Sequence, residues 1–102
     1  MYQLLYYEYP GSLEDATKIC LEAINAVEWI ELSAESEQPL RIPTEGDTYT
    51  IALVNPRVSE SVLAGVIRLF PLENITQIFL YEHCNRLILF VEILLDYFKA
   101  EQ

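Results

Sequence analysis

Basic residues are scarce in this chain of 102 residues, which has 6 Lys and Arg against 16 Asp and Glu and a formal net charge of −10. The basic residues stand singly along the sequence, whereas binding to nucleic-acid phosphates needs clustered positive charge. We therefore expect no direct binding of nucleic acid and no attraction to anionic membranes. The complementary partner for this charge is a basic protein surface.

Histidine and cysteine are also rare, with His83, Cys20 and Cys84 as the whole set. A structural zinc ion needs four such ligands, so the sequence predicts no metal site. Adjacent side chains diverge on a helix and point to opposite faces of a strand, which argues against a catalytic pair of His83 and Cys84. Cys20 is instead expected in the core, and His83 in a turn.

Glycine is sparse as well, with only Gly11, Gly46 and Gly65, all far apart. A phosphate-binding loop, a dinucleotide fingerprint and a nucleophile elbow each need closely spaced glycines. The sequence therefore favours a protein that is not an enzyme and that needs no cofactor.

Long apolar runs are missing too. The longest unbroken run covers residues 87–91, which is far below the roughly 18 residues of a membrane span. No basic residue precedes Lys18, so we expect no secretory signal, a cytoplasmic location and reduced cysteines. The length and the hydrophobic content of 52% suit a single folded domain over residues 1–102.

The first quarter of the chain predicts a strand followed by a helix. Residues 2–9 are rich in aromatic side chains and read as a strand. Ser12 is suited to cap a helix, and apolar residues at three- and four-residue spacing predict that helix over residues 13–27. On its opposite face, Glu14 and Lys18 stand four residues apart and can form an ion pair.

The middle of the chain predicts two strands and a second helix. Residues 28–33 alternate loosely and residues 47–54 alternate well, as strands do. Ser59 is a candidate cap for a helix over residues 60–70, which Pro71 would end.

The last quarter is ambiguous. Residues 75–81 are dense in β-forming side chains. Residues 87–91 are equally apolar and would be the second strand of a hairpin, followed by a short helix from about Glu92; the alternative is one helix over residues 85–100. A continuous helix would place Leu89 among charged residues, so the hairpin is the preferred prediction.

These elements predict an α+β fold, with a mostly antiparallel sheet of four to five strands and two to three helices packed on it. The order is compatible with a ferredoxin-like arrangement that carries a C-terminal extension.

Two features favour binding of a protein partner. The first is an acidic segment between residues 28 and 47, with an aromatic residue near its start; the second is the tyrosine-rich strand, since tyrosine is common in interfaces. The alternatives are a solvated acidic loop and ordinary packing between strands. The candidate partner-binding residues are Glu31, Glu35, Glu37, Glu45, Asp47, Trp29, Tyr7 and Tyr9.

Small size and strong acidity are typical of an inhibitor of the immunity or antitoxin type, which would block a basic toxin such as a nuclease. The same traits suit a protein that mimics the charge of DNA to block a nucleic-acid-binding effector, and they suit an acidic chaperone. An alternative from another class is a small ferredoxin-like enzyme or ligand-binding regulator, dimeric through an exposed sheet face.

Overall fold

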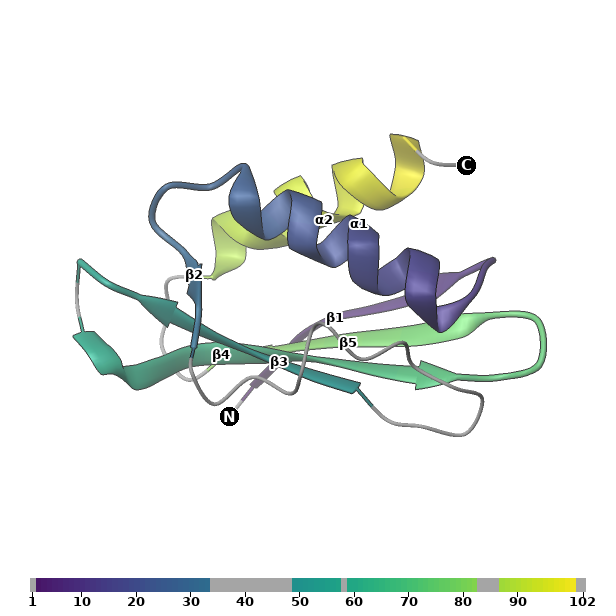
Figure 1. The fold of residues 1–102 in the computed structure, drawn as a ribbon, viewed down its shortest axis with the longest axis horizontal. Coiled ribbons are helices and arrows are strands. Elements are labelled where there is room, and N and C mark those ends of the chain that lie inside the picture. Colours follow the sequence, from purple (N-terminus) through teal and green to yellow (C-terminus); the bar gives the residue numbers. More distant parts are fainter. Residues whose placement is uncertain (1, 34–48, 58, 83–86, 101–102) are drawn as a thin grey trace.

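The computed structural model describes residues 2–33, 49–57, 59–82 and 87–100, and they form an α+β fold, as predicted. Both helices lie on the same side of one antiparallel sheet (Figure 1). Within the described residues the elements are, in chain order, β1 (Tyr2–Tyr9), α1 (Leu13–Asn25), β2 (Glu31–Leu32), β3 (Tyr49–Asn55), β4 (Ser59–Pro71), β5 (Thr76–Glu82) and α2 (Ile88–Ala100).

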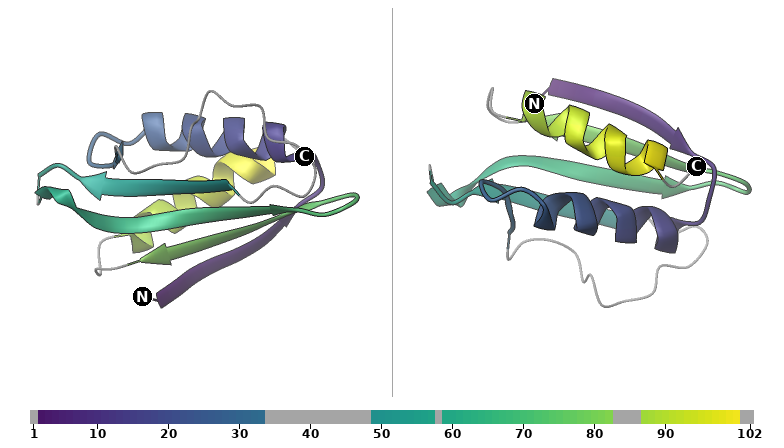
Figure 2. Two further views of the ribbon diagram at one scale, coloured as in Figure 1. Left: turned by 60° about the horizontal axis from the view of Figure 1, so that its bottom comes forward. Right: turned by 90° about the horizontal axis from the view of Figure 1, so that it is seen from above.

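The strand order across the sheet is β1-β5-β4-β3-β2, so β1 and β2 form its two edges. Strands β3, β4 and β5 follow one another as antiparallel neighbours, and β1 pairs with the far side of β5. Helix α1 contacts β2 and β4, α2 contacts β1, and the two helices contact each other. Viewed from the helical side, α2 accordingly lies nearer β1 and α1 nearer β3 (Figure 2).

Helix α1 forms where the sequence predicts it. Ser12 has an extended backbone and its side-chain oxygen accepts a hydrogen bond from the Asp15 amide at 3.1 Å, so it caps the helix. Lys18 and Glu14 form the expected ion pair, with 3.6 Å between nitrogen and oxygen. The apolar stripe of α1, which includes Ala16, Cys20 and Ala23, is fully buried against the sheet and α2.

The core lies between the sheet and the two helices. Both layers contribute residues with no exposed surface, and those of β4 and β5 alternate along the strand because successive side chains point to opposite faces. The fully buried members of this core include Ile67, Leu69, Ile78 and Leu80 from the sheet and Phe90, Leu94 and Phe98 from α2.

The helix predicted for residues 60–70 is wrong, because this segment is the long central strand β4. Apolar residues are so frequent there that they satisfy helical spacing as well as alternation. Burial alternates around Arg68, which is exposed between the buried Ile67 and Leu69, whereas residues 64–67 are all buried. Pairing with β3 on one side and β5 on the other decides the outcome, and the element order departs here from β-α-β-β-α-β.

The hairpin preferred for the last quarter is also wrong, and the alternative of one helix holds. Strand β5 matches the predicted strand, but residues 88–100 form α2. Phe90, Leu94 and Phe98 stand four residues apart and are fully buried together. Leu89 is 69% exposed on the same helix, so it does lie with the charged residues. Burying the three core side chains outweighs exposing one leucine.

Strand β1 carries an irregularity that a regular alternation would miss. Its register with β5 shifts between Gln3 and Leu5. Directly paired residues share a face, so Tyr6, opposite Phe79, lies on the face away from the helices. Tyr2, opposite the buried Glu82, lies on the helix-facing side of the shift. A regular strand would have placed Tyr2 and Tyr6 on one face.

Candidate functional site

Negative charge gathers on the helical side of the molecule. We use the term helical layer for α1, α2 and residues 26–30, which follow α1. In the part of the chain that the structure describes, the exposed carboxylates of the helical layer outnumber its lysines, and Lys18 is already paired with Glu14. These carboxylates are Glu14, Asp15, Glu22, Glu28, Glu92 and Asp96, and the lysines are Lys18 and Lys99.

The sheet side has a different balance. Among the described residues of the strands and their connecting turns from β3 to β5, the exposed charged residues are Arg57, Arg68 and Glu73, and β1 adds Glu8. With Glu31, which is exposed on the edge strand β2, the sheet residues whose burial is described carry three exposed carboxylates against two arginines. Among the described residues, exposed carboxylates are therefore concentrated on the helical layer, and the sheet is close to neutral.

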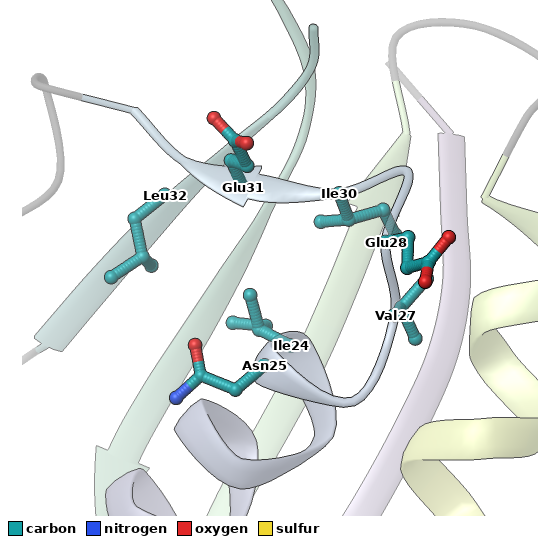
Figure 3. Close-up of a pocket in the computed structure, with 7 residues that line it drawn as sticks. All are labelled: Ile24, Asn25, Val27, Glu28, Ile30, Glu31 and Leu32. Atoms are coloured by element: carbon teal, nitrogen blue, oxygen red, sulfur yellow. The ribbon is translucent and has the colours of Figure 1, made fainter.

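A pocket of about 290 Å³ lies where the last turn of α1 meets β2 (Figure 3). Ile24 and Asn25 project from α1 toward Leu32 of β2, with Ile30 beside them. The carboxylates lie at the rim and not over the apolar floor. The seven lining residues are Ile24, Asn25, Val27, Glu28, Ile30, Glu31 and Leu32.

The chemistry of this pocket suits one long basic side chain. Lysine and arginine lay their methylene stems along apolar surface and keep the charged head near polar groups. Here the stem would lie on Ile24, Ile30 and Leu32, and the head would reach Glu28 or Glu31. With a volume of about 290 Å³, the pocket lies just below the range for small-molecule sites, which starts at about 300 Å³.

The structure describes two of the predicted binding residues of the acidic segment, Trp29 and Glu31. Glu31 is exposed and lines the pocket, and Trp29 is partly buried and packs against the core. The other four acidic candidates, Glu35, Glu37, Glu45 and Asp47, lie outside the described residues. Of this segment, the structure therefore brings Glu28, Trp29 and Glu31 together beside the end of α1.

The two tyrosines chosen from β1 face the helices. The rings of Tyr7 and Tyr9 lie 5.3 Å and 5.4 Å from the ring of Phe98 in α2, between centroids. Tyr9 is 8% exposed, so its ring belongs to the core. Most of the surface of Tyr9 is therefore not available to a partner.

The opposite face of the sheet carries an aromatic cluster that sequence reasoning missed. We call the side away from the helices the open face, and its cluster consists of Tyr6, Phe70, Phe79 and Tyr81. Phe79 lies at its centre, with ring centroids 4.9 Å from Tyr6, 5.5 Å from Phe70 and 6.1 Å from Tyr81. The cluster joins three strands, so only their register reveals it. The one signal in the sequence is the alternation of Phe79 and Tyr81 along β5.

Reactive groups are few among the described residues. Cys20 is completely buried, and burial raises the pKa of its thiol, which therefore stays protonated. Glu82 is 4% exposed and its Oε2 atom has no hydrogen-bond partner. The described residues contain no group of three or more His, Cys, Asp and Glu side chains that could hold a metal ion. His83 and Cys84 lie outside the described residues.

Comparison of the chain with protein-family models, with curated proteins and with solved structures finds no match. Neither described helix has both the length and the apolar character that crossing a membrane requires. The functional argument therefore starts from the charge distribution, the pocket and the open face.

Proposed function

We propose that this protein is an acidic binding module that inhibits a basic protein partner, and that the helical layer and the pocket beside β2 receive that partner. The observation that carries this proposal is the segregation of exposed carboxylates onto one side, with an apolar-floored pocket at its edge. The specific form that we favour is an immunity or antitoxin protein that blocks a basic toxin such as a nuclease. The proposed setting is the cytoplasm, where Cys20 remains a thiol.

The negative charge of the helical layer would act first, by speeding the encounter with the basic partner. A surface of one sign raises the association rate of an oppositely charged partner by roughly 10- to 1,000-fold, and added salt reduces this effect. The pocket would act second, by holding the stem of one lysine or arginine against Ile24 and Leu32. Burial of that stem is less sensitive to salt than the encounter is.

The test is capture of a partner from the source cell by the tagged protein, followed by direct binding measurements on the captured protein. Washing in parallel at about 50 mM and about 500 mM salt changes the Debye length from somewhat over 10 Å to a few Å. Glu28→Lys and Glu31→Lys place positive charge at the pocket rim. Glu73→Lys makes the same charge change in the turn between β4 and β5, and it serves as the matched control.

We expect a stoichiometric basic partner that binds at least tenfold more weakly to the Glu28→Lys and Glu31→Lys variants than to the Glu73→Lys variant. Equal loss in all three variants would mean that only net charge matters, which would reject the pocket. A captured partner that is not basic, or no partner at either salt, would reject the proposal and favour the ligand-binding or enzymatic alternative. Reversal of Glu35, Glu37, Glu45 and Asp47 to Lys tests the rest of the acidic segment.

If the captured protein is a nuclease, inhibition of its activity by the purified module decides whether binding also blocks the active site. If it is a nucleic-acid-binding protein without nuclease activity, the charge-mimic form of the proposal applies. In that case, DNA should compete directly with this protein for binding to the captured partner, and this competition should disappear at high salt.

A further inference from the structure

The open face of the sheet is unusual for a side that no helix covers. An antiparallel sheet with one packed face normally presents polar side chains on the other. Here the aromatic cluster occupies that side across β1, β5 and β4, and Tyr6 is 40% exposed while the other three rings are partly exposed. Beside the cluster on the same face, Val66 and Ala52 are buried, so the exposed apolar surface of this patch is that of the four rings. An exposed apolar patch with polar residues at its rim is one mark of an interaction site.

The polar groups on this face are ordered by the sheet. Tyr6 donates a hydrogen bond of 2.9 Å to Oε1 of Glu8, and its oxygen accepts one of 3.0 Å from Nε2 of Gln77. Arg68 lies opposite Phe79, which lies opposite Tyr6, so these three residues form one row across the strands. Glu8, Gln77 and Phe70 form the adjacent row. The exposed charges of this patch are thus one arginine and one glutamate.

We propose that the open face is the contact surface of a homodimer, in which two copies stack their sheets through the aromatic cluster. Charge argues for a second copy as the occupant. Each chain has a net charge of −10, so two copies meet with least repulsion where the surface is neutral. Among the described residues, the exposed charges of the open face, Arg68 and Glu8, balance each other, whereas the helical layer is acidic. A basic partner would be drawn to the other side of the molecule.

The placement of the two charges also makes this face self-complementary. Arg68 is on β4 and Glu8 is on β1, with β5 between them. Arg68 and Glu8 lie in adjacent rows, so a twofold axis in the plane of contact that crosses β5 obliquely between Phe79 and Gln77 exchanges their positions, and Arg68 of each copy then faces Glu8 of the other. Stacked sheets lie about 10 Å apart, a gap that an arginine and a glutamate can bridge together. Phe79 lies beside this axis and packs on its symmetry mate.

This arrangement leaves the helical layers free. The helices lie on the far side of each sheet from the open face (Figure 1). The dimer therefore presents its two acidic layers outward, and both remain accessible to the basic partner proposed above. The inference does not depend on that function, because either surface can exist without the other.

The test is sedimentation equilibrium of the purified chain in about 150 mM salt, where the Debye length is near 8 Å and long-range repulsion is screened. Three variants probe the interface. Arg68→Glu and Glu8→Arg each place like charges opposite one another, and the combined exchange restores opposite charges. Glu73→Arg makes the same charge change as Glu8→Arg, but in the β4–β5 turn outside the patch.

We expect a dimer for the wild-type protein, at least tenfold weaker dimerisation for each single exchange, and recovery in the double exchange. The Glu8→Arg variant is decisive, because it lowers the negative charge of each chain. If dimerisation followed net charge alone, Glu8→Arg and Glu73→Arg would strengthen it equally; the interface predicts that only Glu8→Arg weakens it. A wild-type protein that is monomeric up to about 1 mM, or a Glu8→Arg variant that dimerises as well as wild type, would overturn the proposal. Circular dichroism of each variant confirms that the fold is kept.

Discussion

Two leucines on α2 provide a direct test of how this helix packs. Leu94 is fully buried in the core, whereas Leu89, five residues earlier on the same helix, is 69% exposed. Replacing a fully buried leucine by alanine costs about 2 to 5 kcal/mol, through lost burial and the cavity left behind. At Leu89 little burial is lost and alanine is the better helix former, so the change stays within about 0.5 kcal/mol.

The assay is urea unfolding of the wild type, Leu94→Ala and Leu89→Ala, followed by far-ultraviolet circular dichroism. For a small domain the slope is about 1 to 3 kcal/mol per molar urea, so a loss of about 3 kcal/mol lowers the midpoint by at least about 1 M. We expect this shift for Leu94→Ala alone, with equal slopes for all three proteins. The matched pair cancels the intrinsic helix preference, because both changes are Leu to Ala in one helix.

The result that would refute this reasoning is a loss at Leu89 as large as that at Leu94. Leu89 would then be buried, as it would be in the second strand of a hairpin, and the docking of α2 described here would be wrong. Small losses at both positions would show that α2 does not pack on the sheet. Either outcome would also remove the helical layer on which the proposed function depends.

Three further predictions concern α1, β4 and the buried thiol. Ser12→Ala should lower the free energy of unfolding by about 1 kcal/mol in urea melts, since it removes the acceptor for the first turn of α1, whereas Ser12→Asp should keep most of it. Gly65→Ala should lower the free energy of unfolding by more than the roughly 0.5 kcal/mol expected of a surface change, because the added methyl group would overlap the carbonyl oxygen of Tyr81 and a methyl group of Leu87. An unchanged melting temperature would contradict the close approach of β4, β5 and residue 87. Cys20, whose pKa is raised by burial, should react with a thiol reagent only when the protein unfolds. Its contribution to the free energy of unfolding should be complete below about pH 8.5 and should decline at higher pH, because the thiol ionises in the unfolded chain and stays protonated in the folded one. Cys20→Ala should remove that part of the pH dependence.

The two proposals assign different kinds of contact to the open face and to the helical layer. Charge on the helical layer acts over distance and responds to salt, while the aromatic cluster acts only on contact. The two proposals therefore predict different salt responses. Raising salt should weaken capture of the basic partner and should leave the dimer unchanged or stronger.

Local sequence determined the parts of this protein that depend on neighbouring residues. The cap at Ser12, the stripe of α1, the ion pair of Lys18 with Glu14, and the strands β1, β3 and β5 follow from spacing and composition. The α+β class follows as well, because the order of strands and helices limits the ways in which apolar faces can be covered. The net charge also predicts a basic partner, and this stays a prediction.

Only the tertiary structure decided what depends on pairing between distant segments. Apolar residues are too dense in β4 and α2 for periodicity to separate strand from helix. Pairing with β3 and β5 makes β4 a strand, and the shared burial of Phe90, Leu94 and Phe98 makes α2 a helix. The aromatic cluster likewise needs the register of three strands, and the shift at β1 sets which face its first residues occupy. Register and burial are properties of the assembled sheet, so a single segment read by itself does not contain them.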